Sequence, residues 1–144
     1  MARKQHSGVT DQRKASIHRM EDAQVLFRGR RWRGAMYLAG YAVECRLKYK
    51  LMQKWNCFTL EELEKRLASR GVSQSLFTHN LDTLLKLAGG RDRVKQNQAI
   101  ANCFSVIDRW QPAWRYDPDL ASWERAADFL RAAGELVTWI ENNL

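Results

Sequence analysis

Hydrophobic residues recur along this chain at the spacing of an α-helix almost throughout. Apolar positions return every three to four residues, and no segment keeps the period of two that is typical of a half-buried strand. The chain contains only two prolines, Pro112 and Pro118, and both fall in one short stretch. The pattern predicts an all-α fold, an up-and-down helical bundle of about four long and two short helices.

The first two predicted helices lie in the N-terminal third. Residues 1–15 are expected to form a polar, frayed arm, and residues 16–144 a single helical domain whose first helix ends near Arg28. A second helix over roughly 31–54 contains the run Gly34–Cys45, whose only charge is Glu44. A segment that is apolar on most faces cannot lie on a surface in contact with water, so we expect this helix to be the centre of the bundle.

Four further segments are expected to be helical: a short one from Thr59 to about Ser69, a short one over 79–88 capped by Thr78, a longer one starting at Asp92, and a last one from about Asp119 to Asn142. Thr59 and Glu62 have the spacing of a capping box. The last helix is predicted to turn Trp123 inward with its apolar stripe.

Charge is distributed unevenly along the chain. The net charge is +8, yet residues 1–54 hold 13 Lys/Arg against 4 Asp/Glu, and residues 55–144 hold 11 against 12. All the excess positive charge therefore lies in the first third. Such polarity favours RNA or another nucleic acid as a partner, because neutralised phosphates release counterions. The alternative is a solvated basic surface that aids solubility.

Cysteine usage and hydropathy indicate a cytoplasmic protein. The three cysteines are an odd number at long spacings without a Cys-x-x-Cys pair, so we expect reduced thiols and no disulfide framework. No apolar segment follows the basic N-terminus as it would in a secretory signal. The run Gly34–Cys45 is too short to span a membrane, so no membrane association is expected.

Familiar catalytic motifs do not occur in the sequence. The histidines His6, His18 and His79 lie far apart, and no Cys/His cluster has metal-ligand spacing. There is also no glycine-rich phosphate loop and no Gly-x-Ser-x-Gly. We therefore expect neither a metal nor another cofactor.

Three sequence blocks resemble a known family. Arg31–Lys48 resembles the signature helix of HEPN domains, small helical bundles associated with RNA cleavage and nucleotide binding. Thr78–Leu85 is similar to the family's Thr-His-Asp-Leu helix start, and Trp110–Tyr116 to its Trp…Arg-Tyr turn. The resemblance implies a prokaryotic homodimer of a defence, toxin–antitoxin or stress system. It also implies, for active members, a metal-independent endoribonuclease.

The catalytic motif of the family is not in its usual place. Active members carry Arg, four to six residues and then His after the signature helix, with two copies meeting across a dimer. Here the only downstream histidine is His79, whose nearest preceding arginine, Arg70, is too far away. The match Arg13–His18 precedes the signature helix and is expected by chance. A divergent catalytic set would consist of Arg70, His79 and Arg115, in which histidine moves protons and arginine stabilises phosphate charge.

Phosphate contacts are expected from a cluster at the break between the first two helices: Arg28, Arg30, Arg31 and Arg33.

Glu44 is expected to pair with Arg or Lys of a neighbouring helix or with a backbone amide, and a role in a site is the alternative. Arg115 and Tyr116 are expected to close their turn onto the bundle. For His79 the alternative to a catalytic role is that of a structural hydrogen-bonding residue.

Two functions remain open on the sequence. One is an RNA-associated HEPN-like protein that cleaves RNA. The other is a non-catalytic HEPN subunit that dimerises or docks on a larger partner through its tryptophan-rich helices, such as a nucleotidyltransferase antitoxin or a CRISPR or other defence complex.

Overall fold

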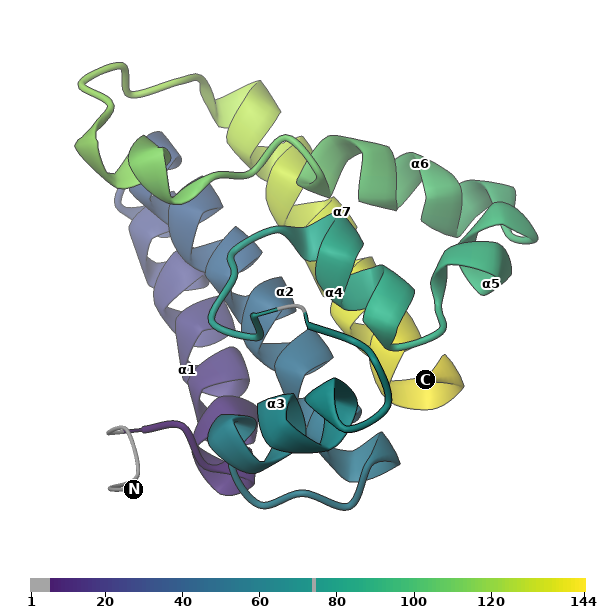
Figure 1. Ribbon diagram of the computed structural model, residues 1–144. Helices are drawn as coiled ribbons and strands as arrows, with labels where there is room; N and C mark the ends of the chain where they lie inside the picture. The colour runs from purple at the N-terminus through teal and green to yellow at the C-terminus, as the bar shows by residue number, and fades with distance from the viewer. Residues whose placement is uncertain (1–5, 74) are drawn as a thin grey trace.

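The computed structural model describes residues 6–73 and 75–144, and within them the chain forms seven α-helices, one short 3-10 helix and no strand (Figure 1). The elements are α1 (Val9–Arg28), α2 (Trp32–Lys54), α3 (Leu60–Ala68), α4 (Leu81–Leu87), α5 (Arg91–Lys95), α6 (Gln98–Ile107), η1 (Pro112–Tyr116) and α7 (Trp123–Asn143). The predicted all-α bundle is confirmed. None of the helices in this part of the chain is both long and apolar enough to cross a membrane.

Helix α2 is the centre of the bundle, as its hydrophobic pattern predicts. Fourteen of its 23 residues are buried, so it has almost no face in contact with water. Helix α1 packs against it antiparallel, with the Ser16 hydroxyl donating to the Ala42 carbonyl at 2.8 Å. Together α1, α2 and α7 form the long framework, and the shorter helices pack along one side of it (Figure 1).

Helix α7 runs parallel to α2, whereas α1 and α2 follow the predicted up-and-down order. The Arg33 amide near the start of α2 donates to the Leu120 carbonyl just before α7, at 3.0 Å. Towards the other ends of the two helices, Arg46 forms an ion pair with Glu141 at 3.1 Å. The parallel arrangement is possible because α3 to α6 and η1 carry the chain back to the top of the bundle (Figure 1).

The prediction of a frayed arm over residues 1–15 is wrong for residues 7–15, which are packed against the bundle or belong to α1. Residues 1–5 lie outside the described residues. Helix α1 begins at Val9, where the Gly8 amide donates to the Asp11 carboxylate at 3.2 Å and so caps the first turn. The Val9 amide donates to the Phe58 carbonyl at 2.9 Å. This contact across the bundle holds the start of α1, which hydrophobic periodicity alone could not show.

The starts of α4 and α6 differ from the prediction because each helix is capped by an asparagine that the prediction did not include. The Asn80 side chain, not Thr78, accepts from the Thr83 amide at 3.0 Å, so α4 begins at Leu81. The helix predicted from Asp92 is two helices, since Asn97 accepts from the Ile100 amide at 3.2 Å and starts α6 anew. The bundle therefore has three long helices and four shorter ones within the described residues.

The predicted start of α3 is confirmed, and the predicted inward position of Trp123 is wrong. Thr59 accepts from the Glu62 amide at 3.2 Å, although the Glu62 carboxylate reaches back to Phe58 rather than to Thr59. Trp123 is the first residue of α7, following the Ser122 cap, and its side chain is 57% exposed. The inward face of α7 is instead formed by residues such as Phe129 and Leu136.

A close contact between Gly40 and Trp110 joins α2 to the segment after α6. A Cβ atom on residue 40 would overlap the Trp110 indole ring. The indole is 5% exposed and its Nε1 donates to the Tyr37 carbonyl at 2.9 Å. Only a residue without a side chain leaves room for the ring at this point of α2.

Substitution of Gly40 by alanine tests this contact. We expect Gly40→Ala to lower the free energy of unfolding by about 1–3 kcal/mol, because the ring or the helix must shift. Urea denaturation followed by circular dichroism measures the change.

Gly134→Ala is the matched control, since Gly134 is also in a long helix but a Cβ there meets nothing within 4 Å. This variant should be as stable as the parent or up to about 1 kcal/mol more stable. Equal stability of the two variants would contradict the proposed fit of Trp110.

Candidate functional site

One face of α2 carries polar and aromatic side chains in place of aliphatic ones. Tyr37, Tyr41, Glu44 and Lys48 follow one another at intervals of four, three and four residues. This spacing places them in a row along the helix. We call these four residues the site face.

Glu44 is the centre of a buried cluster of charged and polar groups on the site face. Its side chain is 2% exposed, and its carboxylate accepts from Lys48 Nζ at 3.2 Å and lies 2.6 Å from His79 Nδ1. The Lys48 side chain is 6% exposed. Glu44 is therefore paired, as predicted, but with a lysine of its own helix and with a histidine instead of with a cation from a neighbouring helix.

The short contact to Glu44 fixes the proton arrangement of His79. A carboxylate offers only acceptors, so the contact requires that Nδ1 carries hydrogen and donates. In the neutral imidazole, Nε2 is then the nitrogen that can accept a proton. The His79 side chain is 48% exposed, so one side of the ring is held by a buried carboxylate while the remainder stays accessible.

A pocket of about 410 Å³ adjoins this cluster. Tyr41, Glu44, Lys48 and His79 all line it, together with residues of the N-terminal segment and of α3. The buried charges thus form one wall of a cavity and are not enclosed on all sides. A histidine oriented by a carboxylate beside a cavity is the arrangement that general acid–base catalysis uses.

Two other ionisable groups beside the cluster stay neutral near neutral pH. Burial, followed by the nearby Cys45 and Glu44, raises the pKa of Tyr41 to about 12. Burial, followed by Glu44, raises the pKa of the Cys45 thiol to about 12. Tyr41 is therefore a hydrogen-bond donor and not a base, and Cys45 is not a nucleophile.

Aromatic contacts connect this cluster to Arg115. His79 and Trp110 form a T-shaped contact with 6.3 Å between ring centroids, and Trp110 stacks on Tyr37 at 6.0 Å. The guanidinium of Arg115 lies 6.0 Å from the centroid of Tyr37. Arg115 therefore lies beside Tyr37, at one end of the site face, and His79 lies beside Glu44, towards the other end. Tyr37 and Glu44 are seven residues apart, which corresponds to about 10 Å along the axis of α2.

A second pocket of about 380 Å³ adjoins the Tyr37 end of the site face. Arg31, Tyr37 and Arg115 line it. The structure thus brings together Arg31, predicted as a phosphate contact, and Arg115, predicted as a catalytic residue. Both are exposed, which is what contact with a phosphate backbone requires.

Of the other arginines of the predicted cluster, Arg33 lines the same pocket but its side chain is buried and paired, and Arg28 and Arg30 do not line it. Arg33 is 8% exposed, donates to the Asp119 carbonyl at 3.1 Å and lies 3.5 Å from the Asp117 carboxylate. It is therefore a structural contact between α2 and the segment before α7, and not an accessible phosphate ligand. Arg28 and Arg30 are exposed at the turn between α1 and α2.

Arg70 does not join the candidate site within one chain. It follows α3, and its guanidinium lies over Trp55 at 4.8 Å from the ring centroid. Trp55 is 18 residues beyond Tyr37, about 27 Å along the axis of α2. The structure thus places His79 and Arg115 along one face and Arg70 at the far end of α2.

Tyr116 does not close its turn onto the bundle. Its side chain is 76% exposed and stacks with the guanidinium of Arg115, at 4.9 Å from the ring centroid. The anchoring role belongs to Trp114, which is 9% exposed and packs on Phe129 at 5.4 Å between centroids.

Lys48 and Tyr41 are members of the site that the sequence analysis did not identify. The spacing of Tyr41, Glu44 and Lys48 places them on one face of a helix, so the sequence could have predicted that these two residues lie beside Glu44. The contact of Glu44 with His79 spans 35 residues and carries no local signal. Among residues 6–73 and 75–144, no group of three or more His, Cys, Asp or Glu side chains is placed to hold a metal ion.

Comparison of the chain with protein-family models, curated proteins and solved structures finds no match. Functional inference therefore depends on the residues of this chain and their geometry.

The buried ion pair of the cluster can be tested by stability measurements. Glu44→Leu leaves the Lys48 ammonium buried without its partner, so we expect a loss of about 3–5 kcal/mol in the free energy of unfolding. The double variant Glu44→Leu/Lys48→Met removes both charges and should lose less than the single variant. Urea unfolding of the single and double variants measures the coupling. Additive losses would show that the two groups do not interact.

Proposed function

We propose that this protein is a HEPN-like RNA-associated protein that cleaves RNA without a metal ion, with His79 as its general base. The observation that carries the proposal is the Glu44–His79 contact of 2.6 Å in the wall of a 410 Å³ pocket. The second pocket, with Arg31 and Arg115, lies at the other end of the site face. The resemblance of Arg31–Lys48 to the HEPN signature helix points to the same function.

The chemistry assigned to each group is as follows. His79 Nε2 accepts the proton of a ribose 2′-hydroxyl, whose oxygen then bonds to the adjacent phosphorus. The bond from phosphorus to the 5′-oxygen breaks, and the proton returns from the imidazole to that oxygen. The products are a 2′,3′-cyclic phosphate and a 5′-hydroxyl. The reaction needs no oxidant, reductant or metal.

The neighbouring side chains support this reaction. Tyr41 keeps its hydroxyl proton and donates it as a hydrogen bond to a phosphate oxygen, on which negative charge increases in the transition state. Glu44 holds the imidazole in the tautomer that leaves Nε2 as the acceptor. Arg31 and Arg115 bind the strand through its phosphates, and Tyr37 offers a partly buried ring on which a base can stack.

Cleavage of RNA in the presence of EDTA tests the catalytic role of His79. We expect the purified protein to cut fluorescently labelled single-stranded RNA, and His79→Ala to lower the rate by about 10²–10⁴-fold. Gel analysis of the products, with detection of the cyclic phosphate end, measures the reaction.

The control is His18→Ala, which removes the histidine of the chance Arg13–His18 match on α1, outside the Glu44 cluster. This variant should retain the parent rate. Equal losses in the two variants, or intact RNA with the parent protein, would contradict the role of His79.

Binding of RNA tests Arg31 and Arg115 separately from catalysis. In the His79→Ala background, Arg31→Gln and Arg115→Gln should each weaken binding of single-stranded RNA. Each should also reduce the slope of log affinity against log salt concentration by about 0.7, because one phosphate contact is lost. Fluorescence anisotropy at several salt concentrations measures both quantities.

Lys95→Gln is the matched control, since Lys95 is an exposed cation on α5, at the opposite side of the bundle from the turn between α1 and α2 (Figure 1). It should leave the affinity and the slope unchanged. A loss equal to that of Arg31→Gln would indicate binding by net charge alone.

A second candidate function is a non-catalytic subunit that dimerises or docks on a larger protein. It is favoured by three exposed apolar side chains in one short stretch before and at the start of α7: Tyr116 (76%), Leu120 (54%) and Trp123 (57%). Exposed large apolar side chains that lie together are typical of interaction surfaces. A stable homodimer by light scattering together with intact RNA would favour this function over the first.

A further inference from the structure

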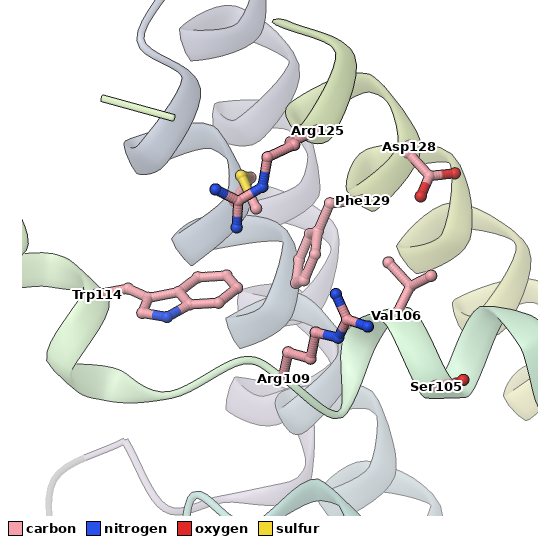
Figure 2. Close-up of a pocket in the computed structure, with 8 residues that line it drawn as sticks. Ser105, Val106, Arg109, Trp114, Arg125, Asp128 and Phe129 are labelled. Atoms are coloured by element: carbon pink, nitrogen blue, oxygen red, sulfur yellow. The ribbon is translucent and has the colours of Figure 1, made fainter. Parts of the chain in front are cut away.

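Trp114 also lines a pocket that has no part in the proposed RNA chemistry. This pocket has a volume of about 310 Å³ and lies between the end of α6, the segment around η1 and the start of α7 (Figure 2). Its position depends on the packing of Trp114 against Phe129, at 5.4 Å between ring centroids. The site face of α2 contributes no residue to it.

Two arginines line this pocket without a partner. Arg109 and Arg125 both line it, and in Figure 2 their guanidiniums lie on opposite sides of the Phe129 ring. Neither guanidinium forms a hydrogen bond or an ion pair within residues 6–73 and 75–144. Two like charges that face one cavity concentrate a positive potential there, which attracts an anion.

The acidic residue of the pocket does not neutralise these arginines. Asp128 is bound by Arg131 at 2.9 Å, and Arg131 also contacts Glu135 at 3.1 Å. In Figure 2 the Asp128 carboxylate points away from the guanidinium of Arg125. The cavity therefore keeps two uncompensated positive charges.

The inner wall of the pocket is apolar and firmly packed. Met36 is 3% exposed, Phe129 2% and Trp114 9%. Side chains buried to this degree have fixed positions, so the cavity is formed before a ligand arrives. An apolar wall beside two guanidiniums fits a ligand that has an anionic end and an apolar or planar body.

We propose that this pocket binds a small phosphate monoester, with Arg109 and Arg125 supplying the positive charge for the phosphate and with its apolar or planar group against Met36, Trp114 and Phe129. Guanidinium groups match the geometry and charge of phosphate oxygens. The volume is at the lower end of small-molecule sites, which fits a small ligand and not a polymer strand. The proposal does not depend on RNA cleavage by His79.

Isothermal titration calorimetry at low salt tests the proposal with three probes. Phenyl phosphate carries both parts of the proposed ligand, whereas inorganic phosphate lacks the ring and phenol lacks the anion. We expect phenyl phosphate to bind at least tenfold more tightly than inorganic phosphate, and phenol not to bind. Arg109→Gln and Arg125→Gln should each weaken phenyl phosphate binding at least tenfold.

Two further variants complete the test. Val106→Phe places a larger side chain in the lining and should block phenyl phosphate binding. Arg13→Gln removes an exposed arginine of α1 that does not line the pocket and should leave the affinity unchanged. Circular dichroism confirms that each variant is folded.

Several results would overturn the proposal. One is no binding of phenyl phosphate by the parent protein, and another is equal affinity in the parent and both arginine variants. A third is loss of RNA affinity in Arg109→Gln and Arg125→Gln without any binding of phenyl phosphate, which would assign the arginines to RNA. Loss of RNA cleavage in His79→Ala with normal phenyl phosphate binding would leave the proposal intact.

Discussion

The burial of charged side chains on α2 is the constraint on which the rest of the structure depends. A charged side chain on a helix at the centre of a bundle has little contact with solvent, so it needs an opposite charge or a hydrogen-bond partner. Arg33 forms an ion pair with Asp117 in the segment before α7, and Arg46 forms one with Glu141 on α7. Lys48 pairs with Glu44 on its own helix. The contacts of Arg33 and Arg46 hold α7 parallel to α2 and in register with it.

The same constraint changes the meaning of the uneven charge distribution. Part of the excess positive charge of residues 1–54 is bound internally by carboxylates of the C-terminal third, as Arg33 and Arg46 show. The cations of this segment that remain accessible are fewer and lie at defined places; Arg31, for example, lines the pocket at Tyr37 together with Arg115 from the C-terminal part of the chain. Net charge alone therefore overstates the basic surface, and the position of each arginine decides its role.

Local sequence patterns predicted most helices of this fold. They could not predict which residues far apart in the sequence come into contact, and these contacts determine the composition of the candidate site. The apolar run from Gly34 to Cys45 identified the central helix because burial leaves a direct trace in composition. Glu44 and His79 were both candidates, yet their contact joins residues 35 positions apart and has no local signature. Arg70 was chosen for its closeness to His79 in sequence, whereas the fold carries it to Trp55 at the other end of α2.

The contact of Trp110 with α2 has a consequence for how the sequence can vary. The indole lies against Gly40, donates to the Tyr37 carbonyl and makes a T-shaped contact with His79, so one side chain joins α2, the segment after α6 and the segment before α4. A larger residue at position 40 requires a smaller one at position 110, and the loss of the ring would then remove the support of the imidazole. Homologues that keep the paired histidine and glutamate are therefore expected to conserve glycine and tryptophan together, as a correlated pair.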